Sequence, residues 1–389
     1  MSRRLSPRAG RVRAKQTSVV VVSHACVVDV NQEPFRALAA RGVRVHVIAP
    51  KSLRTDLRGT ISFRALDGVD ATALPVRIGG FRRGIRQAGV HMILYTGLRE
   101  AIRIHEPSLI YVEEEPWSFT AMQAARIARE IGVPFVFHQS QNVAKRLPPP
   151  FESIRRRVLR EAAGATVRLQ GAARVLRDAG FAAPMLSIPN VVDPARFDGA
   201  TPLHPGMARP VFGFVGRLVA EKGIVDFIDA AAAAGAGSAL IAGDGPLRAA
   251  AEAAARRAGL DARFTGSVPH DAVAGIFASI DILAIPSRTA RGWKEQFGRV
   301  VIEANAAGVP VVATECGALG ETVRETGGGI VVGESDPVTL AAALRRLGDD
   351  KTERARLGEA GRAAVRERFT PEAVAKDLHE FFTRLEDDR

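Results

Sequence analysis

Short apolar runs alternate with longer helix-like segments along most of the chain, and this alternation restricts the fold more than any other feature. In the first half, strands are predicted at residues 19–22, 43–49, 109–112 and 134–137, and helices at 34–41 and 120–131. Strands that are apolar along their whole length are typical of a parallel sheet covered by helices on both faces. The first half is therefore predicted to be a doubly wound α/β domain.

A second set of the same kind follows a stretch rich in proline. Residues 187–210 hold five prolines and few periodic apolar positions, which indicates a connection between domains. Beyond it, strands are predicted at 211–215, 238–242, 263–265, 282–285, 309–313 and 329–332, and helices at 224–234, 247–258 and from about 337 to the end. Because one core rarely grows past about 250–300 residues, the 389 residues predict two such domains in tandem.

The net charge of +12 lies entirely in the first half. Residues 1–195 carry 30 Lys and Arg against 15 Asp and Glu, whereas the remainder carries 24 against 27. Such a field attracts anionic membranes, phosphorylated substrates or nucleic acid, although a solvated arginine-rich surface gives the same count. No zinc spacing, RNA-binding aromatic motif or helix-turn-helix pattern accompanies the charge, so no nucleic-acid partner is expected.

The ends and the cysteines indicate where the protein works. The basic residues 1–16 precede the apolar run at 19–22, but His24 and Asp29 soon interrupt it, so we expect a flexible tail and a buried strand instead of a secretion signal. No apolar run reaches the roughly 18 residues that span a bilayer. Two cysteines far apart in sequence suit a reducing compartment, and we expect a cytoplasmic protein.

Three glycine-containing loops follow predicted strands of the second half. Gly216 allows a sharp exit from a strand, and Arg217 and Lys222 then place two cations beside a helix N-terminus, which suits a diphosphate. Gly243 lies in a tight turn at the next strand end, where open α/β sheets bind ligands. Gly266 to Val268 exposes backbone on which a planar base can rest. Each loop taken alone is also typical of an ordinary structural turn.

The most specific pattern is a pair of glutamates eight residues apart. Glu295 and Glu303 flank an apolar stretch that contains Phe297 and Gly298, and Gly308 ends the helix that follows. A carboxylate accepts hydrogen bonds from vicinal hydroxyls, so Glu303 suits a ribose and Glu295 suits a sugar. Two solvated glutamates on an amphipathic helix are the structural alternative.

Taken in this order, the four motifs resemble the donor domain of the family 4 retaining glycosyltransferases, which have the two-domain GT-B architecture. The resemblance is clear over residues 187–370 and looser over 17–186. It implies two Rossmann-like domains facing a cleft, an acceptor-binding one at 17–188 and a donor-binding one at 189–370. It also implies that residues 371–389 form a helix that packs back on the first domain.

The resemblance assigns a role to each motif residue. Arg217 and Lys222 would bind the donor pyrophosphate, Glu303 the ribose and Glu295 the transferred sugar, and the backbone near Gly266 would meet the base. Residues predicted to contact the donor are Gly216, Arg217, Lys222, Gly243, Gly266, Val268, Glu295, Phe297, Gly298 and Glu303. His138, at the end of the strand before Gln139, would face the cleft and the donor sugar, although a lone histidine in that position is often structural.

The sequence departs from the family pattern in three loops. The loop at residues 24–31 lacks the usual glycine pair, Val191 stands where glycine is commoner, and Ala318 stands where a second glycine is usual. The first departure makes it unsafe to infer the acceptor site by analogy. The other two concern packing and loop shape more than donor chemistry.

The predicted activity is metal-independent transfer of a hexose-type sugar, with retention, from a nucleotide diphosphate donor to a glycan or a lipid-linked acceptor. No Asp-x-Asp pair occurs in the chain, so Arg217, Lys222 and a helix N-terminus are expected to neutralise the departing diphosphate, and no cofactor is expected. Polysaccharide or glycolipid assembly is the natural setting. The alternatives are a nucleotide-sugar epimerase of the same fold, a catalytically silent sugar-nucleotide-binding subunit and a non-enzymatic protein that binds anionic surfaces.

Two basic segments in the first half suggest contact with a membrane. Residues 81–86 and 154–160 interleave arginines with apolar residues. Segments of this composition dock on anionic lipid. Peripheral association with the inner face of the membrane is therefore predicted as a separate hypothesis.

Overall fold

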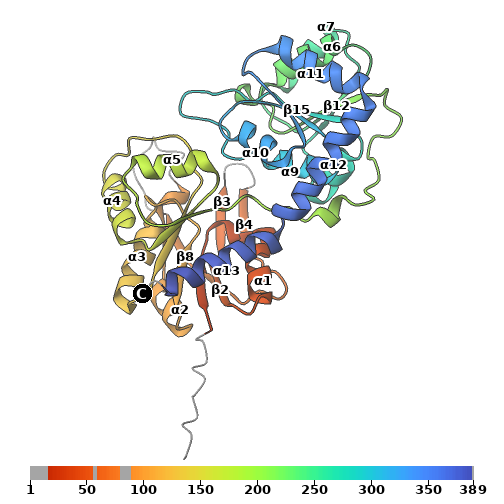
Figure 1. The fold of residues 1–389 in the computed structure, drawn as a ribbon. Helices are drawn as coiled ribbons and strands as arrows, with labels where there is room; N and C mark the ends of the chain where they lie inside the picture. The colour runs from red at the N-terminus through yellow and green to blue at the C-terminus, as the bar shows by residue number, and fades with distance from the viewer. Residues whose placement is uncertain (1–15, 56–58, 79–88, 388–389) are drawn as a thin grey trace, which may run out of the picture.

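The computed structural model describes residues 16–55, 59–78 and 89–387, and it folds into two lobes, each built around a parallel sheet (Figure 1). The first sheet has the order β11-β10-β9-β8-β1-β2-β5. Its strands are β1 (Ser18–Val22), β2 (Arg44–Pro50), β5 (Ala71–Leu74), β8 (Leu109–Val112), β9 (Phe135–Gln139), β10 (Gly164–Val167) and β11 (Met185–Ser187).

The second sheet has the order β14-β13-β12-β15-β16-β17, and all of its pairs are parallel. Its strands are β12 (Val211–Val215), β13 (Ser238–Ala242), β14 (Ala262–Gly266), β15 (Ile282–Ile285), β16 (Val311–Thr314) and β17 (Gly329–Val332). The predicted pair of doubly wound parallel sheets is therefore confirmed.

Successive side chains of each strand point to opposite faces of the sheet, and a layer of helices covers each face. In β1, Val20 and Val22 pack with helices α2 (Leu98–Ile104), α3 (Phe119–Ile131), α4 (Phe151–Glu161) and α5 (Gln170–Asp178). Val19 and Val21 point to the other face, which α1 (Glu33–Ala40) and α13 (Pro371–Asp387) cover. Because both faces are buried, the strand is apolar at every position after Ser18.

The second sheet is covered in the same way. One face packs with α6 (Ile224–Ala234), α7 (Arg248–Arg257) and α11 (Pro337–Asp349), and the other with α8 (Val273–Phe277), α9 (Arg299–Ala306) and α10 (Leu319–Thr326). Helix α12 (Lys351–Arg368) contributes residues to both layers. As predicted, Asp336 caps α11, since its carboxylate accepts a hydrogen bond from the Thr339 N–H at 3.0 Å.

The last helix returns to the first lobe. Figure 1 shows α13 lying across that lobe beside α1 and β2. Its residues Leu378, Phe381 and Phe382 are buried in the core around β1, and the Phe382 ring lies 5.5 Å from that of Tyr111. The predicted C-terminal helix that crosses back to the first domain is confirmed, so the first lobe contains chain from both ends of the sequence.

Two small antiparallel pairs were missed by the sequence analysis. β3 (Ser52–Thr55) pairs with β4 (Gly59–Ser62), and β6 (Val76–Ile78) pairs with β7 (Ile93–Tyr95). These strands are three or four residues long, and several of their positions are exposed, so they carry little apolar signal. No helix within the described ranges is both long and apolar enough to cross a bilayer.

Candidate functional site

Each sheet has one place where the strand order reverses. In the second sheet, β12 and β15 are neighbours, and the chain runs outward from them in opposite directions. Loops that leave such adjacent strands diverge, which opens a crevice at their carboxyl ends where ligands bind. Here the loop after β12 carries Gly216, Arg217 and Lys222, and the loop after β15 carries Glu295. The topology therefore gathers the predicted donor residues at one crevice.

Glycines let the loops after β12, β13 and β14 lie against one another. A Cβ on Gly243, which has φ of +145°, would overlap the carbonyl oxygen of Gly216. The Gly243 N–H donates to the Gly266 carbonyl at 2.9 Å. The structure thus brings these three predicted positions together. On the other side of the crevice, a Cβ on Gly223 would overlap the carbonyl of Pro286, the residue directly after β15.

Lys222 and Glu295 form an ion pair at this crevice. The Lys222 ammonium donates a hydrogen bond to a Glu295 carboxylate oxygen, and both side chains are mostly buried. The ammonium also lies 5.3 Å from the centre of the Trp293 ring. The backbone carbonyl of Glu295 accepts the Ala318 N–H at 2.9 Å. Glu295 is therefore fixed from two directions, and it orients Lys222.

Arg217 is the more mobile of the two predicted cations. Its side chain is 49% exposed, and its ion pair with Glu221 spans 3.8 Å, so it is weakly held. It lies just before α6, whose first-turn N–H groups have no acceptor within the helix. A mobile cation beside a helix N-terminus is suited to an anionic ligand.

Glu303 lies in α9, which starts at Gly298. Gly298 has φ of +79°, and a Cβ there would overlap the side chain of Leu319, so glycine is required. Burial raises the pKa of the Glu303 carboxyl, and Arg299, whose Nε lies 3.5 Å away, opposes that shift. A mostly buried carboxylate with one distant cation keeps acceptor capacity for hydroxyl groups.

Packing decides which atoms of two predicted donor residues can meet a ligand. The Phe297 ring is 2% exposed and lies in the core against Phe369, with ring centres 6.3 Å apart. It therefore supports Gly298 from behind and offers no surface to a ligand. Val268 is also packed against this core, which leaves its backbone as the group that can meet a base.

His138 lies at the end of β9 as predicted, but its side chain does not face an open cleft. The imidazole is 4% exposed, and its nitrogens lie 2.8 Å from the Thr166 hydroxyl and 2.9 Å from the Ser140 hydroxyl. Burial and the charge of Arg168 lower its pKa well below the usual value. The expectation that His138 faces the cleft is corrected, because the ring lies within the first lobe and both nitrogens have partners.

The switch point of the first sheet lies between β1 and β8, and it carries groups that the sequence analysis missed. Three glutamates, Glu113 to Glu115, follow β8 directly. The Ser23 hydroxyl donates to Glu113 at 2.9 Å, and His24 Nδ1 lies 2.5 Å from Glu114. Burial alone lowers the pKa of His24, but Glu114 outweighs it and the pKa is raised, which favours imidazolium. The sequence signal that could have revealed this site is the run of three acidic residues directly after an apolar strand.

Several buried polar atoms around this switch point lack partners. Within the described part of the chain, no hydrogen bond reaches Oε2 of Glu114, Oε2 of Glu115, the Tyr95 hydroxyl or Nδ1 of His91. Buried polar groups are nearly always paired in native proteins, so a group of orphaned atoms indicates a ligand or ordered water. A carboxylate, a phenol and an imidazole are the groups that bind hydroxyls and amines.

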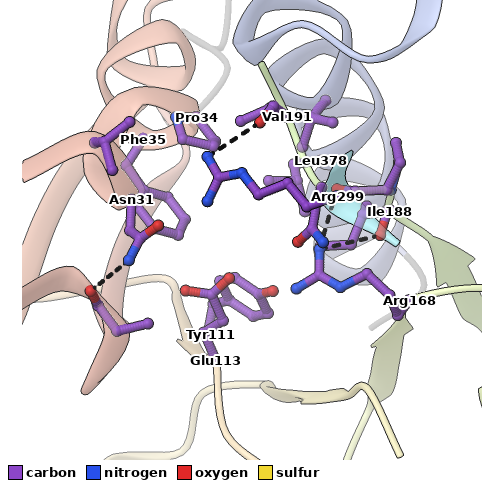
Figure 2. Close-up of a pocket in the computed structure, with 15 residues that line it drawn as sticks. Asn31, Pro34, Phe35, Tyr111, Glu113, Arg168, Ile188, Val191, Arg299 and Leu378 are labelled. Atoms are coloured by element: carbon purple, nitrogen blue, oxygen red, sulfur yellow. Dashed lines mark hydrogen bonds between the residues drawn. The ribbon is translucent and has the colours of Figure 1, made fainter. Parts of the chain in front are cut away.

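A cavity of about 160 Å³ lies where the two lobes meet (Figure 2). The side chains of Glu113 and Arg168 from the first lobe and Arg299 from α9 converge on it. Arg168 is held by the carbonyl of Pro189 at 3.1 Å, and Arg299 by that of Val191 at 3.4 Å. Burial raises the pKa of Glu113 while Arg168 opposes the shift. This cavity lies between the switch point of the first sheet, the start of α9 and the connecting segment.

Direct hydrogen bonds also cross between the lobes. Asn142 Nδ2 donates to the backbone carbonyl of Glu295 at 2.8 Å, and the Gln170 N–H donates to the Glu321 carboxylate at 2.8 Å. The first contact ties a loop after β9 to the residue that holds Lys222. The two sites therefore face each other across the interface.

Two facing Rossmann-like lobes, with a cationic crevice in one and an acidic crevice in the other, define a glycosyltransferase of the GT-B architecture. The family described as glycosyl transferases group 1 matches residues 203–364, and glycosyltransferase family 4 matches residues 32–196. The chain belongs to this family of enzymes.

Individual relatives agree with this assignment. The 2-deoxystreptamine glucosyltransferase of Streptomyces kanamyceticus is 32% identical over 269 residues, which cover 62% of this chain and 67% of that protein. The 2-deoxystreptamine N-acetyl-D-glucosaminyltransferase of Streptomyces fradiae is 28% identical, with 77% and 76% covered. Among solved structures, HepE from Anabaena in complex with UDP superposes with a TM-score of 0.68 at 18% identity, covering 95% of this chain and 100% of that one. That likeness concerns the fold.

Proposed function

We propose that the enzyme transfers a hexose, with retention, from a nucleoside diphosphate sugar to a hydroxyl group of a polar acceptor. The contact between Lys222 and Glu295 carries this proposal. In such a donor the anomeric carbon is bonded directly to a phosphate oxygen. A group that binds the phosphate and a group that binds the sugar must then be neighbours, as these two are.

The diphosphate fits the crevice by charge. Lys222 and Arg217 supply two cations, and α6 supplies helix-terminal N–H groups and the positive end of its dipole. Glu295 lowers the cost of holding Lys222 partly buried before the donor binds. Binding would then draw the ammonium toward the phosphate while the carboxylate turns to sugar hydroxyls.

The nucleoside would bind farther along the carboxyl ends of the strands of the second sheet. Glu303, held inside the lobe with Arg299 as its cation, would accept hydrogen bonds from the ribose diol. The backbone beside Gly266 and Val268 would contact the base. The relative solved with UDP shares the fold, which supports a nucleoside diphosphate as the ligand class.

Cleavage of the bond between the sugar and the phosphate places negative charge on the departing diphosphate and positive charge on the anomeric carbon. Arg217, Lys222 and the start of α6 would stabilise the departing oxyanion. The acceptor oxygen bonds to the anomeric carbon, and its proton passes to the departing phosphate oxygen. The chain has no Asp-x-Asp pair, so we propose that this step needs no metal ion.

The acceptor would bind at the first switch point. Glu114 and the orphaned Tyr95 and His91 offer hydrogen-bonding atoms without existing partners among the described residues. A glycan, a lipid-linked glycan or an aminocyclitol carries hydroxyl or amine groups that match them. The two Streptomyces relatives are named for transfer to 2-deoxystreptamine, which supports inclusion of the aminocyclitol class.

Membrane association remains a separate proposal. In α4, apolar residues of the basic segment pack into the core of the first lobe and do not face lipid. Residues 154–160 lie in α4, where Ile154 and Val158 are buried in the core of the first lobe. Arg155 and Arg157 are paired with Glu152 and Glu161. Residues 81–86 lie outside the described residues. Any docking through α4 would therefore be electrostatic. Flotation with anionic vesicles would show binding that salt removes, whereas equal binding to neutral vesicles would contradict it.

A transfer assay tests the proposal. The protein is incubated with UDP-, GDP- and ADP-hexoses and with representative glycan, glycolipid and aminocyclitol acceptors, and products are identified by mass spectrometry and NMR. We expect a glycosylated product with retained anomeric configuration, formed equally well with excess chelator. Free epimerised donor would identify an epimerase, an inverted product would exclude retention, and loss of turnover with chelator would exclude the metal-free mechanism.

A further inference from the structure

A cluster of two histidines and an aspartate lies near the end of the first sheet where β1 and β2 begin. His46 is in β2, Asp70 directly precedes β5, and His105 follows α2. The starts of β1 and β2 line the same cavity, of about 330 Å³, whereas the crevice described above lies at the strands' carboxyl ends. Figure 1 shows α2 at the end of this lobe that is remote from the second lobe. The cluster therefore has no part in the proposed sugar transfer.

The geometry brings three ligand atoms together. One nitrogen of each histidine and one Asp70 oxygen all lie within 4.8 Å of one another. The two imidazoles are stacked, with ring centres 3.4 Å apart and planes at 18°. In a tetrahedral zinc site with bonds of about 2.1 Å, ligand atoms are about 3.4 Å apart. Nearly parallel rings direct their nitrogen lone pairs along parallel planes, so the partly exposed His105 ring must turn for both imidazoles to bind one ion. Asp70 is 69% exposed, so rotation of its side chain can close the remaining difference.

His46 has one nitrogen bonded and the other open. Its Nε2 lies 3.0 Å from the Thr72 hydroxyl. Its Nδ1 is buried and lies 2.9 Å from Asp70 Oδ2, but it is not aligned as a hydrogen bond to that oxygen or to any other described residue. Metal-bound histidines usually have the second nitrogen held by a hydrogen bond, which fixes the ring and leaves the first nitrogen aimed at the metal.

We propose that His46, Asp70 and His105 bind a divalent transition-metal ion of the Zn²⁺ type, with water completing the coordination. Two imidazoles and one carboxylate suit Zn²⁺, whereas Mg²⁺ and Ca²⁺ prefer oxygen ligands. The charged groups that face the cluster are Arg44 and Glu106, which line the same cavity. The ion would tie α2 to β2 and β5.

The full chain, purified without a histidine tag and freed of metal, is titrated with Zn²⁺ by calorimetry. We expect one ion per chain with a dissociation constant in the micromolar range or below, and a higher Tm in its presence. His105→Ala and Asp70→Asn alter more exposed positions and should weaken binding at least tenfold. His379→Ala, on α13, is the matched control and should bind like the wild type.

Two further outcomes decide the proposal. Co²⁺ bound at the site should give the intense visible absorption of a four-coordinate ion, and His105→Ala should abolish it. Mg²⁺ and Ca²⁺ should produce neither heat nor stabilisation. Failure of Zn²⁺ to bind, or equal binding to the wild type and His105→Ala, would identify a stacked histidine pair without a metal and overturn the metal site. Sugar transfer, assayed well below the Tm, would be unchanged by these variants and so tests a different claim.

Discussion

Lys222 donates a hydrogen bond to Glu295, a residue 73 positions later in the chain, and this contact joins the loops that leave β12 and β15. Neither residue is exceptional by itself, because lysines and glutamates are common after strands. We propose that their meeting at the point where the strand order reverses gives them a common ligand.

Replacing Lys222 with methionine should keep much of the side-chain volume while removing the cation. Because the ammonium is expected to stabilise the departing diphosphate, turnover should fall by at least about 100-fold. Steady-state kinetics measure this, and circular dichroism checks that the variant is folded. Glu295→Gln should also lower turnover, since it removes the negative charge that holds Lys222 and replaces one of the two acceptor oxygens with a donor. Wild-type turnover in both variants would refute the assigned roles.

Arg217→Ala should lower kcat at least about 100-fold, because the guanidinium is expected to stabilise charge that develops in the transition state. The half-exposed side chain has little structural role, so the Tm should change little. Arg256→Ala serves as the control, as Arg256 is exposed in the last turn of α7. Equal kcat for Arg217→Ala and the wild type would remove Arg217 from the mechanism.

Asn142→Ala and Asn142→Asp both remove the donor that crosses from the first lobe to the Glu295 carbonyl. A single hydrogen bond contributes about 1 kcal/mol, so kcat/KM should fall roughly fivefold in each variant. The Tm should change little, since each lobe has its own core. The prediction fails if both variants keep the wild-type kcat/KM.

Stability should depend on pH through Glu115. Burial raises the pKa of its carboxyl from 4.5 to about 8, although the Ser140 and Gln141 N–H groups oppose the shift. Below about pH 4.5 the group is protonated in both folded and unfolded protein, and its contribution to stability is fully present. Between 4.5 and 8 only the unfolded chain loses the proton, so rising pH weakens the fold by roughly 1 kcal/mol per pH unit.

Denaturant unfolding of the wild type and Glu115→Gln across this range isolates the effect, because the variant cannot titrate at that position. The stability difference should change steadily between pH 5 and 8 and become constant above about 8. A difference that does not vary with pH would contradict the raised pKa.

The fold could be predicted from sequence because its signals are local. Four successive valines in β1 indicate a strand buried on both faces, and Asp336 with Pro337 indicates a helix start. The hairpin of β3 and β4 gave no comparable signal, as its residues are few and partly exposed. The crossing of α13 came from the family resemblance.

The donor site was predictable to the level of loops, but not to that of side-chain direction. Lys222 and Glu295 meet as their loops implied, and Arg217 lies in the same loop as Lys222. The side chains of Phe297 and His138 are buried in the interiors of their lobes. Which of two neighbouring residues is buried is decided by the packing of the folded chain. Groups on distant elements, such as His46 in β2 and His105 after α2, share no sequence spacing that could reveal them.

Nucleotide binding to Glu303 is the most direct test of the donor site. Calorimetric titration with UDP, GDP, ADP and CDP is made on the wild type, on Glu303→Ala and on Glu359→Ala, a control at an exposed glutamate of α12. We predict that one nucleotide binds selectively, that Glu303→Ala weakens it about 10- to 100-fold, and that the control does not. The 2′-deoxy nucleotide should bind more weakly than its ribose form to the wild type, but equally to Glu303→Ala. No binding of any nucleotide to the wild type, or equal binding to Glu303→Ala, would contradict the account.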